Sequence, residues 1–159
     1  MKKALSIFAL LVIIIANCNA QDYRHRAGLH MGYGFSSYYT EGCFEYDFDD
    51  KHRIGAMAGA ANFYNIHKED LAYAWSFSAG GSFNWVGNIS DNTYWFIGPA
   101  AMVFVGNVVD FAFGLHLGAE YRFSSPLRLG IDFRPLFSIT PLSGNYFDSP
   151  VFLSLKWSF

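Results

Sequence analysis

The stretch FAFGLHLGAEYRFSSPLRLGIDFR, from Phe111 to Arg134, alternates between two kinds of side chain. Large apolar residues occupy most of its odd positions, and Gly, Ala or charged residues occupy most of its even positions. The alternation stops at Ser124-Ser125-Pro126 and resumes in the same phase at Leu127. A period of two residues is typical of β-strands, and a short Ser/Pro break between two such runs predicts an antiparallel hairpin.

The same alternation recurs on both sides of this hairpin and predicts eight strands. The third strand is too rich in Ala and Gly for its facing to be assigned. In the fourth, the Gly80-Gly81 pair predicts a β-bulge that switches the facing. Turns are predicted at Asp49–His52 and Asn88–Asn92, and longer loops at Asn65–Asp70 and Thr140–Ser149. The predicted strands are Arg24–Phe35, Thr40–Phe48, Arg53–Tyr64, Leu71–Trp85, Tyr94–Val105, Phe111–Phe123, Leu127–Arg134 and Val151–Phe159.

Residues 1–20 have the pattern of a secretory signal peptide. Lys2 and Lys3 precede the apolar run Ala4–Ala16, and Cys18-Asn19-Ala20 places small residues at the positions that a signal peptidase reads, which predicts cleavage before Gln21. A membrane anchor is one alternative, but the 13 apolar residues fall short of the roughly 20 that span a bilayer. Lipidation of Cys18 is a second alternative, although Asn17 stands where a lipoprotein signal has a small residue.

The composition of residues 21–159 excludes several classes of protein. Cys43 is the only cysteine there, so no intramolecular disulfide can form. The charge is mildly negative and scattered, without the basic patch that a nucleic-acid-binding protein needs. No stretch reaches 18 uncharged apolar residues, so transmembrane helices are not expected. The chain is 19% aromatic and only 15% charged, which is difficult to accommodate in a small soluble domain.

Residue size indicates which face of the strands points inward. Eight strands enclose a space that side chains just fill, so repeated Phe, Leu and Tyr would overfill it, whereas Gly, Ala, Ser and a few long polar groups fit. A closed barrel would bring the charges of the small-residue face together across its interior; in an open sheet they would be solvated. Aromatic residues near strand ends favour the girdles of a membrane barrel. The predicted lumenal charges are His116, Glu120, Arg122, Arg128, Asp132, Arg134, Glu41, Glu45 and Asp47.

The terminal stretch VFLSLKWSF, Val151–Phe159, places Val, Leu, Leu, Trp and Phe on one face and Ser154, Lys156 and Ser158 on the lumenal face. A cleaved signal, eight amphipathic strands and this strand alternating to a final Phe resemble the small eight-stranded outer-membrane β-barrel superfamily of Gram-negative bacteria. GAEYRFSSPLRLGIDFRP, residues 118–135, is similar to the penultimate hairpin of uncharacterised barrels in that group. The resemblance covers residues 21–159.

This resemblance implies an all-β, eight-stranded antiparallel up-and-down transmembrane β-barrel in the cell outer membrane. It also implies contact with outer-membrane lipid, and recognition by the outer-membrane assembly machinery through the strand that ends at Phe159. We expect a monomer that binds no nucleic acid. The superfamily does not fix a function, because its members include structural anchors, adhesins, small-molecule conduits and lipid-modifying enzymes.

No residues are assigned as catalytic, cofactor-binding or metal-binding, and no cofactor is expected. Lipid A deacylases of similar size use a His and a Ser close together on a late strand, but His116 is flanked by Leu115 and Leu117. Asp49, Asp50 and His52 include the residue types of an outer-membrane aspartyl-type protease, yet their spacing indicates a charged hairpin tip. The five histidines lack ligand spacing.

The sequence therefore predicts a non-enzymatic outer-membrane barrel with a structural or surface-interaction role and a lumen largely filled by polar side chains. One alternative is a lipid-modifying barrel enzyme, which would need a Ser/His pair within hydrogen-bond reach at the barrel rim. The other is a soluble secreted β-sandwich or lipocalin-like binder, whose aromatic face would be internal.

Overall fold

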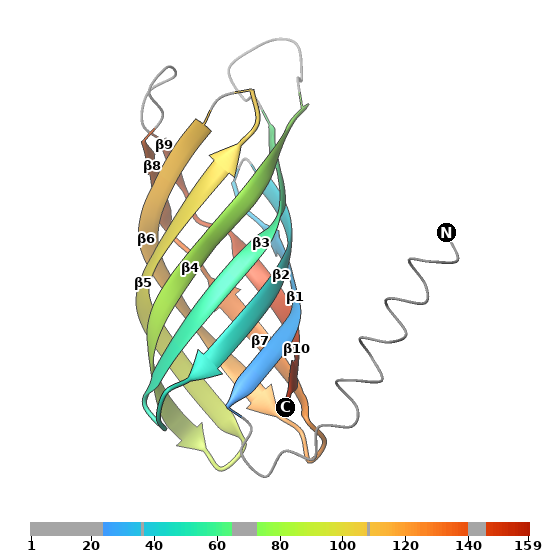
Figure 1. Cartoon of the computed structure of the whole chain (residues 1–159), viewed down its shortest axis with the longest axis vertical. Coiled ribbons are helices and arrows are strands. Elements are labelled where there is room, and N and C mark those ends of the chain that lie inside the picture. Colours follow the sequence, from blue (N-terminus) through green and yellow to red (C-terminus); the bar gives the residue numbers. More distant parts are fainter. Residues whose placement is uncertain (1–23, 36, 65–72, 108, 140–145) are drawn as a thin grey trace, which may run out of the picture.

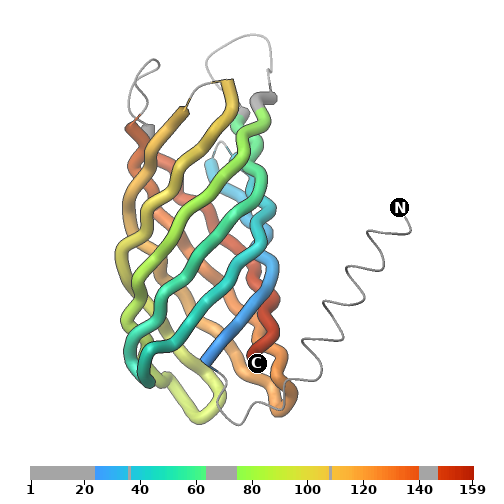
Figure 2. The backbone as a smooth tube through the Cα atoms, viewed as in Figure 1, coloured from blue at the N-terminus to red at the C-terminus, as the bar shows by residue number. Residues whose placement is uncertain are grey.

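The computed structural model describes residues 24–35, 37–64, 73–107, 109–139 and 146–159. These residues form a single antiparallel sheet that closes on itself as a barrel (Figures 1 and 2). The predicted signal peptide and Cys18, and the predicted loop Asn65–Asp70, lie outside the described residues. The strands are β1 (His25–Tyr33), β2 (Ser37–Asp47), β3 (His52–Tyr64), β4 (Tyr73–Ser90), β5 (Thr93–Val105), β6 (Val109–Arg122), β7 (Leu127–Phe133), β8 (Leu136–Ile139), β9 (Tyr146–Asp148) and β10 (Val151–Ser158).

The ten strands make an eight-stranded barrel because two of the eight are interrupted. β7 and β8 are separated by Arg134-Pro135, and β9 and β10 by Ser149-Pro150. A proline cannot donate to the ladder, but the neighbouring groups still bond, as the Arg134 amide donates to the Pro150 carbonyl at 3.0 Å. Consecutive strands pair in order around the ring, and β1 closes it against β10. The predicted up-and-down topology is confirmed.

Four details of the predicted strands are wrong. The register of β4 runs without a break through Gly80-Gly81, so there is no bulge there. The pairing of β4 with β5 shifts register between Asn88 and Ser90. β4 therefore continues through residues predicted as a turn. Tyr146–Asp148, predicted as part of a loop, is the short strand β9. The seventh predicted strand extends beyond Pro135 as β8, which pairs with β6.

The two ends of the barrel carry different connections. We call the end that holds the start of β1 and the end of β10 the terminal end, and the opposite one the distal end (Figure 1). The β2–β3, β4–β5 and β6–β7 turns lie at the terminal end. There the backbones of His25 and Phe159 exchange two hydrogen bonds, at 3.2 and 2.9 Å, so the last residue is held in the ring.

Along most of the strands, side chains alternate between the outside and the inside of the ring. Thirty large apolar side chains are exposed on the described strands and turns, with Leu153 at 65%, Trp75 at 62% and Phe111 at 58%. The charged residues of the same strands are mostly buried. This arrangement is the opposite of a soluble barrel with an aromatic core. It also assigns the facing of β3, whose Arg53, Met57 and Ala61 point inward.

Within the described residues there is no helix of the length and apolarity needed to cross a membrane.

Candidate functional site

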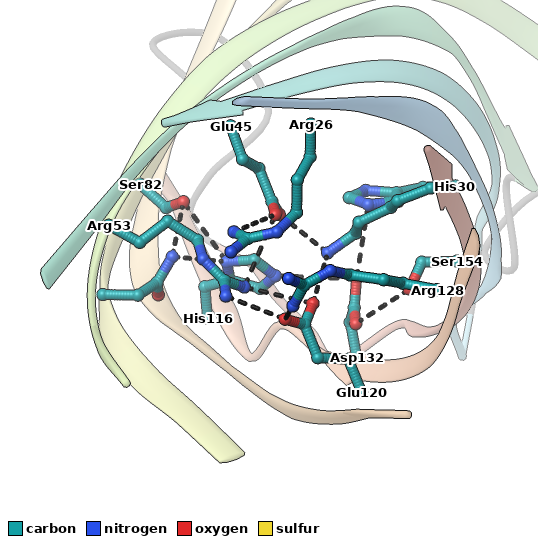
Figure 3. A network of polar contacts seen from close by, with 12 residues as sticks. Arg26, His30, Glu45, Arg53, Ser82, His116, Glu120, Arg128, Asp132 and Ser154 are labelled. Atoms are coloured by element: carbon teal, nitrogen blue, oxygen red, sulfur yellow. Dashed lines mark hydrogen bonds and ion pairs between the residues drawn. The ribbon is translucent and has the colours of Figure 1, made fainter. Parts of the chain in front are cut away.

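Buried charged side chains from six of the eight barrel strands converge inside the barrel (Figure 3). Seven of the nine predicted lumenal charges are buried, whereas Asp47 and Arg122 are half-buried near the terminal end. Sequence reasoning missed Arg26 and Arg53, although Arg26 alternates in phase with the small-residue face of its strand. The buried charged and histidine side chains are Arg26, His30, Glu41, Glu45, Arg53, His116, Glu120, Arg128, Asp132, Arg134, Asp148 and Lys156.

Glu120 on β6 is the acceptor at which two cations meet. Arg53 on β3 donates to it through both terminal guanidinium nitrogens, at 2.8 and 3.2 Å, and so crosses the barrel interior. Arg128 on β7 donates to the same carboxylate at 2.7 Å and also to Ser158 Oγ at 2.8 Å. Two-point pairing of a guanidinium with a carboxylate fixes both groups in orientation as well as in distance.

Glu45 on β2 links Lys156 on β10 to the Arg53–Glu120 pair. It accepts a hydrogen bond from Lys156 Nζ at 2.7 Å and lies 3.4 Å from the Arg53 guanidinium. Asp47 accepts from Arg53 Nε at 2.9 Å and from two nitrogens of Arg26. We call this set the terminal network. Its members are Arg26, Glu45, Asp47, Arg53, Glu120, Arg128 and Lys156.

The ring of Phe96 lies against two of these cations. The Arg53 guanidinium is 5.7 Å from the ring centroid and the Lys156 ammonium 5.4 Å. Both distances lie within the range of cation–π attraction, which is stronger where water is excluded. Phe96 thus supplies a partner for positive charge in a layer with four cations and three carboxylates.

A middle layer of the lumen centres on Asp132. One of its oxygens faces Nε2 of His30 at 3.5 Å and Nε2 of His116 at 3.7 Å. The Arg134 guanidinium donates to His30 Nδ1 at 2.6 Å, which leaves the ring proton of neutral His30 on Nε2, directed at Asp132. Asp132 therefore receives two long contacts, with a third from Ser154 at 3.4 Å.

His116 is within hydrogen-bond reach of a serine. Its Nδ1 lies 3.2 Å from Ser82 Oγ and 3.2 Å from the amide nitrogen of Asn84. With Asp132 on the other side of the ring, the three residue types are those of a hydrolytic triad. All three are buried halfway along the lumen, however, and not at the barrel rim. A substrate bond would have to enter the packed interior to reach Ser82.

Above the middle layer, Arg134 connects the polar interior to an aromatic one. Arg134 donates to Glu41 at 2.6 Å, and its guanidinium lies 3.9 Å above the ring centroid of Phe152. Gly32 leaves room for that ring, since a Cβ there would lie 2.3 Å from Phe152 Cδ1. Four ring contacts between 5.3 and 6.1 Å join what we call the distal aromatic cluster. Its members are Tyr39, Phe63, Phe104 and Phe152.

Asp148 on β9 ties the distal end together. Its carboxylate accepts hydrogen bonds from Tyr39 OH at 2.8 Å, from Ser37 Oγ, and from the Phe35 amide at 3.1 Å. The Ser149 amide adds a fourth at 3.0 Å. A buried carboxylate with four donors is well satisfied. The short strand β9 is thereby fixed to the start of β2.

At the terminal end the lumen opens into a cavity of about 370 Å³. Asp47, Arg53 and Arg128 belong both to its lining and to the terminal network, so the network forms its inner wall. The Arg128 guanidinium also lies 5.6 Å from the ring centroid of Tyr94. The other lining residues are Arg24, Asp49, Asp50, Val86, Asn88 and Arg122.

The described residues show no cluster of three or more His, Cys, Asp or Glu that could hold a metal ion. Cys43 is a buried free thiol that lines the lumen on β2. The Asp49, Asp50 and His52 group, expected as a hairpin tip, forms the β2–β3 turn, where Asp49 accepts from the amides of Lys51 and His52.

No protein-family model matches the chain, and a search of curated proteins found no match. Among solved structures, Neisserial surface protein A is similar over 85% of this chain and 96% of its own, with a TM-score of 0.65 and 11% identity. A de novo designed transmembrane β-barrel matches over 88% and 98%, with a TM-score of 0.55 and 12% identity. At these identities the likeness concerns the fold. The chain therefore has the fold of the small eight-stranded transmembrane β-barrels.

Proposed function

We propose that this chain is a non-enzymatic protein of the Gram-negative outer membrane, exported by the signal peptide of residues 1–20. The observation that carries the proposal is the inversion of polarity around a closed ring. Apolar side chains cover the outside and ion pairs occupy the inside. A hydrocarbon environment stabilises that outer surface, and a closed ladder leaves no backbone group unpaired in lipid.

The contents of the lumen support a structural or surface-interaction role over a conduit. The Arg53–Glu120 pair crosses the terminal half of the lumen, and the rings of Tyr39 and Phe152 lie together in the distal half at 5.4 Å. A solute crossing the barrel would have to displace both. Removing one partner of a buried ion pair leaves an uncompensated charge, which is strongly unfavourable. A lumen largely filled by side chains follows.

The Ser82–His116 contact gives little support to the alternative of a lipid-modifying enzyme. Lipid reaches the outer surface of the barrel, whereas Ser82 Oγ points inward beside Asn84, whose amide nitrogen donates to it at 3.0 Å. A catalytic serine has to meet its substrate, and a buried hydrogen bond between neighbouring polar residues accounts for this geometry.

Two measurements on one preparation test the proposal. Outer membranes are separated on gels with and without boiling, and we expect the folded barrel to migrate differently from its heated form. The purified protein is then placed in planar lipid bilayers, where we expect no stable conductance. Recovery in the soluble periplasmic fraction without detergent would refute the membrane assignment. Large, stable channels would refute the filled lumen alone.

Recognition by the outer-membrane assembly machinery rests on the strand that ends at Phe159. In the barrel the Phe159 ring stacks on His25 at 5.9 Å with an interplanar angle of 17°. We expect deletion of Phe159 to reduce the folded protein in the outer membrane while processed protein still reaches the periplasm. Phe159→Tyr is the matched control, because it keeps the backbone bonds and the ring. Normal membrane levels of the deletion would contradict this role.

A further inference from the structure

A groove of about 500 Å³ lies on the outside of the barrel at its terminal end. The β2–β3 turn forms one side, and β4 and β5 form the other. Trp85 is 48% exposed and Trp95 40%, so two indole rings line the apolar part. The groove thus lies where the apolar outer surface meets a charged turn. Its lining is Asp50, Lys51, His52, Trp85, Val86, Gly87, Asn88 and Trp95.

The floor of the groove is held in place by two close contacts. The Trp95 indole lies across Gly87, where a Cβ would come within 2.5 Å of Nε1 and Cε2 of that ring. The turn is tied to β4 by the Val86 amide, which donates to the Lys51 carbonyl at 2.7 Å. These contacts fix the indole and the turn relative to each other without using any side-chain charge.

Among the described residues, one cation and one anion at the groove have no polar partner. Asp49 is engaged within the turn, because it accepts from the Lys51 amide at 2.7 Å and contacts the His52 ring at 2.9 Å. The His52 contact lowers the pKa of Asp49. In the part of the chain that the structure describes, the Lys51 ammonium and the Asp50 carboxylate form no hydrogen bond or ion pair. An ammonium and a carboxylate on adjacent residues therefore point into solvent beside an aromatic floor.

We propose that this groove binds the headgroup of phosphatidylethanolamine in the membrane leaflet at the terminal end. Lys51 pairs with the phosphate and Asp50 with the primary ammonium, while Trp85 and Trp95 contact the glycerol and upper acyl chain. Indole rings favour this interfacial depth because one part of the ring is apolar and one part is a donor. The inference rests on the proposed membrane location.

Headgroup chemistry selects this lipid over two others of similar size. Phosphatidylglycerol offers the phosphate but no cation for Asp50. Phosphatidylcholine offers a cation without an N–H, so it cannot donate a hydrogen bond to the carboxylate. Of the three lipids, phosphatidylethanolamine alone offers both a phosphate for Lys51 and an N–H donor for Asp50.

Native mass spectrometry of the purified barrel tests the proposal. The protein is equilibrated in detergent with equal amounts of the three lipids, all with the same acyl chains, and retained lipid is counted. Exposed ion pairs are weak, so we expect about threefold preference for phosphatidylethanolamine. Asp50→Asn should abolish the preference over phosphatidylglycerol, and Lys51→Gln should reduce retention of all three lipids.

The control for these variants is Asp91→Asn, which removes an exposed carboxylate from the β4–β5 turn outside the groove. It should retain the wild-type preference. Gly87→Ala should displace the Trp95 ring and reduce lipid retention with no change in charge, and Trp95→Phe should reduce it where Gly87→Ala fails to fold.

Equal retention of the three lipids by a barrel that still shows heat-modifiable migration would overturn the groove proposal and leave the membrane location intact. Wild-type preference in Asp50→Asn would also overturn it. A protein that lacks heat-modifiable migration would instead contradict the proposed function. The two failures are therefore distinguishable in one preparation.

Discussion

The two halves of the lumen are closed by different chemistry. In the terminal half, carboxylates are shared among arginines and a lysine, as when Glu120 accepts from both Arg53 and Arg128. In the distal half, rings pack edge to face, as Phe63 does on Phe104 at 5.3 Å and 88°. Arg134 lies at the boundary, paired with Glu41 and stacked on Phe152.

This difference determines how each half responds to damage. In the terminal network the partners depend on one another, because removing one acceptor takes a contact from more than one buried cation. In the distal aromatic cluster the contacts are independent of charge, and removing a ring leaves a cavity whose cost depends on how far its neighbours relax. Mutational effects should therefore be larger and less additive in the terminal half.

The largest expected effect comes from Glu120→Ala. This change leaves Arg53 and Arg128 without the carboxylate that both contact, and we expect it to lower the free energy of unfolding by about 4 kcal/mol. Urea titration of the barrel in lipid vesicles measures the change. Glu120→Gln should cost less, because it keeps acceptor capacity on one side-chain atom.

The exposed carboxylate of Asp91 is the control for charge as such, and Asp91→Asn should leave the midpoint within about 0.5 kcal/mol of wild type. If Glu120→Ala leaves the urea unfolding midpoint unchanged, the terminal half is not more sensitive to mutation than the distal half.

A somewhat smaller effect is expected for Phe152→Ala in the distal half. Loss of the ring removes its contacts with Tyr39 and leaves the Arg134 guanidinium without its aromatic face, at a cost of about 3 kcal/mol. The same titration measures it. Phe152→Leu should recover part of the loss. The double variant Phe152→Ala/Tyr39→Ala tests additivity. If it lowers the free energy of unfolding by much more than the sum of the two single variants, effects in the distal half are not additive.

Asp148→Asn tests the polar contact at the edge of the distal cluster. The amide places a donor opposite donors such as Tyr39 OH, so we expect a loss of about 2 kcal/mol. Tyr39→Phe removes a single one of these hydrogen bonds and should cost about 1 kcal/mol. Amide hydrogen exchange should localise the effect to β9 and the start of β2. Equal losses for the two variants would mean that the carboxylate contributes no more than one bond.

The smallest expected effect is that of Ser158→Ala. It removes the acceptor of Arg128 Nε but leaves the charge pair with Glu120 in place, so the loss should be about 1 kcal/mol. The urea midpoint again measures it. A loss as large as that of Glu120→Ala would show that hydrogen bonds to uncharged acceptors, and not pairing with carboxylates, dominate the terminal half.

The facing of the strands was predictable because it follows from the local alternation of residue types at odd and even positions. Alternation identified the hairpin from Phe111 to Arg134, the terminal strand and the inward charges of β2, β6 and β7. Closure of the ring was expected because the small-residue face fits the space that eight strands enclose. Each of these inferences needs only a period of two and the small volume inside eight strands.

The partners within the lumen were not predictable by the same route. Arg53 and Glu120 are 67 residues apart, and only the register around the ring brings them together. The interior rings of Phe96, Phe104 and Phe152 were also missed, because the size argument placed large side chains outside. Space for Phe152 depends on Gly32, a contact between strands that alternation does not reveal. The bulge predicted at Gly80-Gly81 was wrong because a glycine pair is equally compatible with an unbroken strand whose side chains take up little space.

Closure of the ring between β1 and β10 has a consequence for the order of events in folding. Leu29 pairs with Leu155, and Lys156 bonds to Glu45 across a separation of 111 residues. Contacts this distant form late, because the loop entropy they remove is large. Until the final strand arrives, the terminal network lacks Lys156, and Arg26 and Glu45 lie at an open seam that needs water. The chain therefore has to stay hydrated on one side while its other side enters lipid, and sealing of the seam and drying of the interior become a single step.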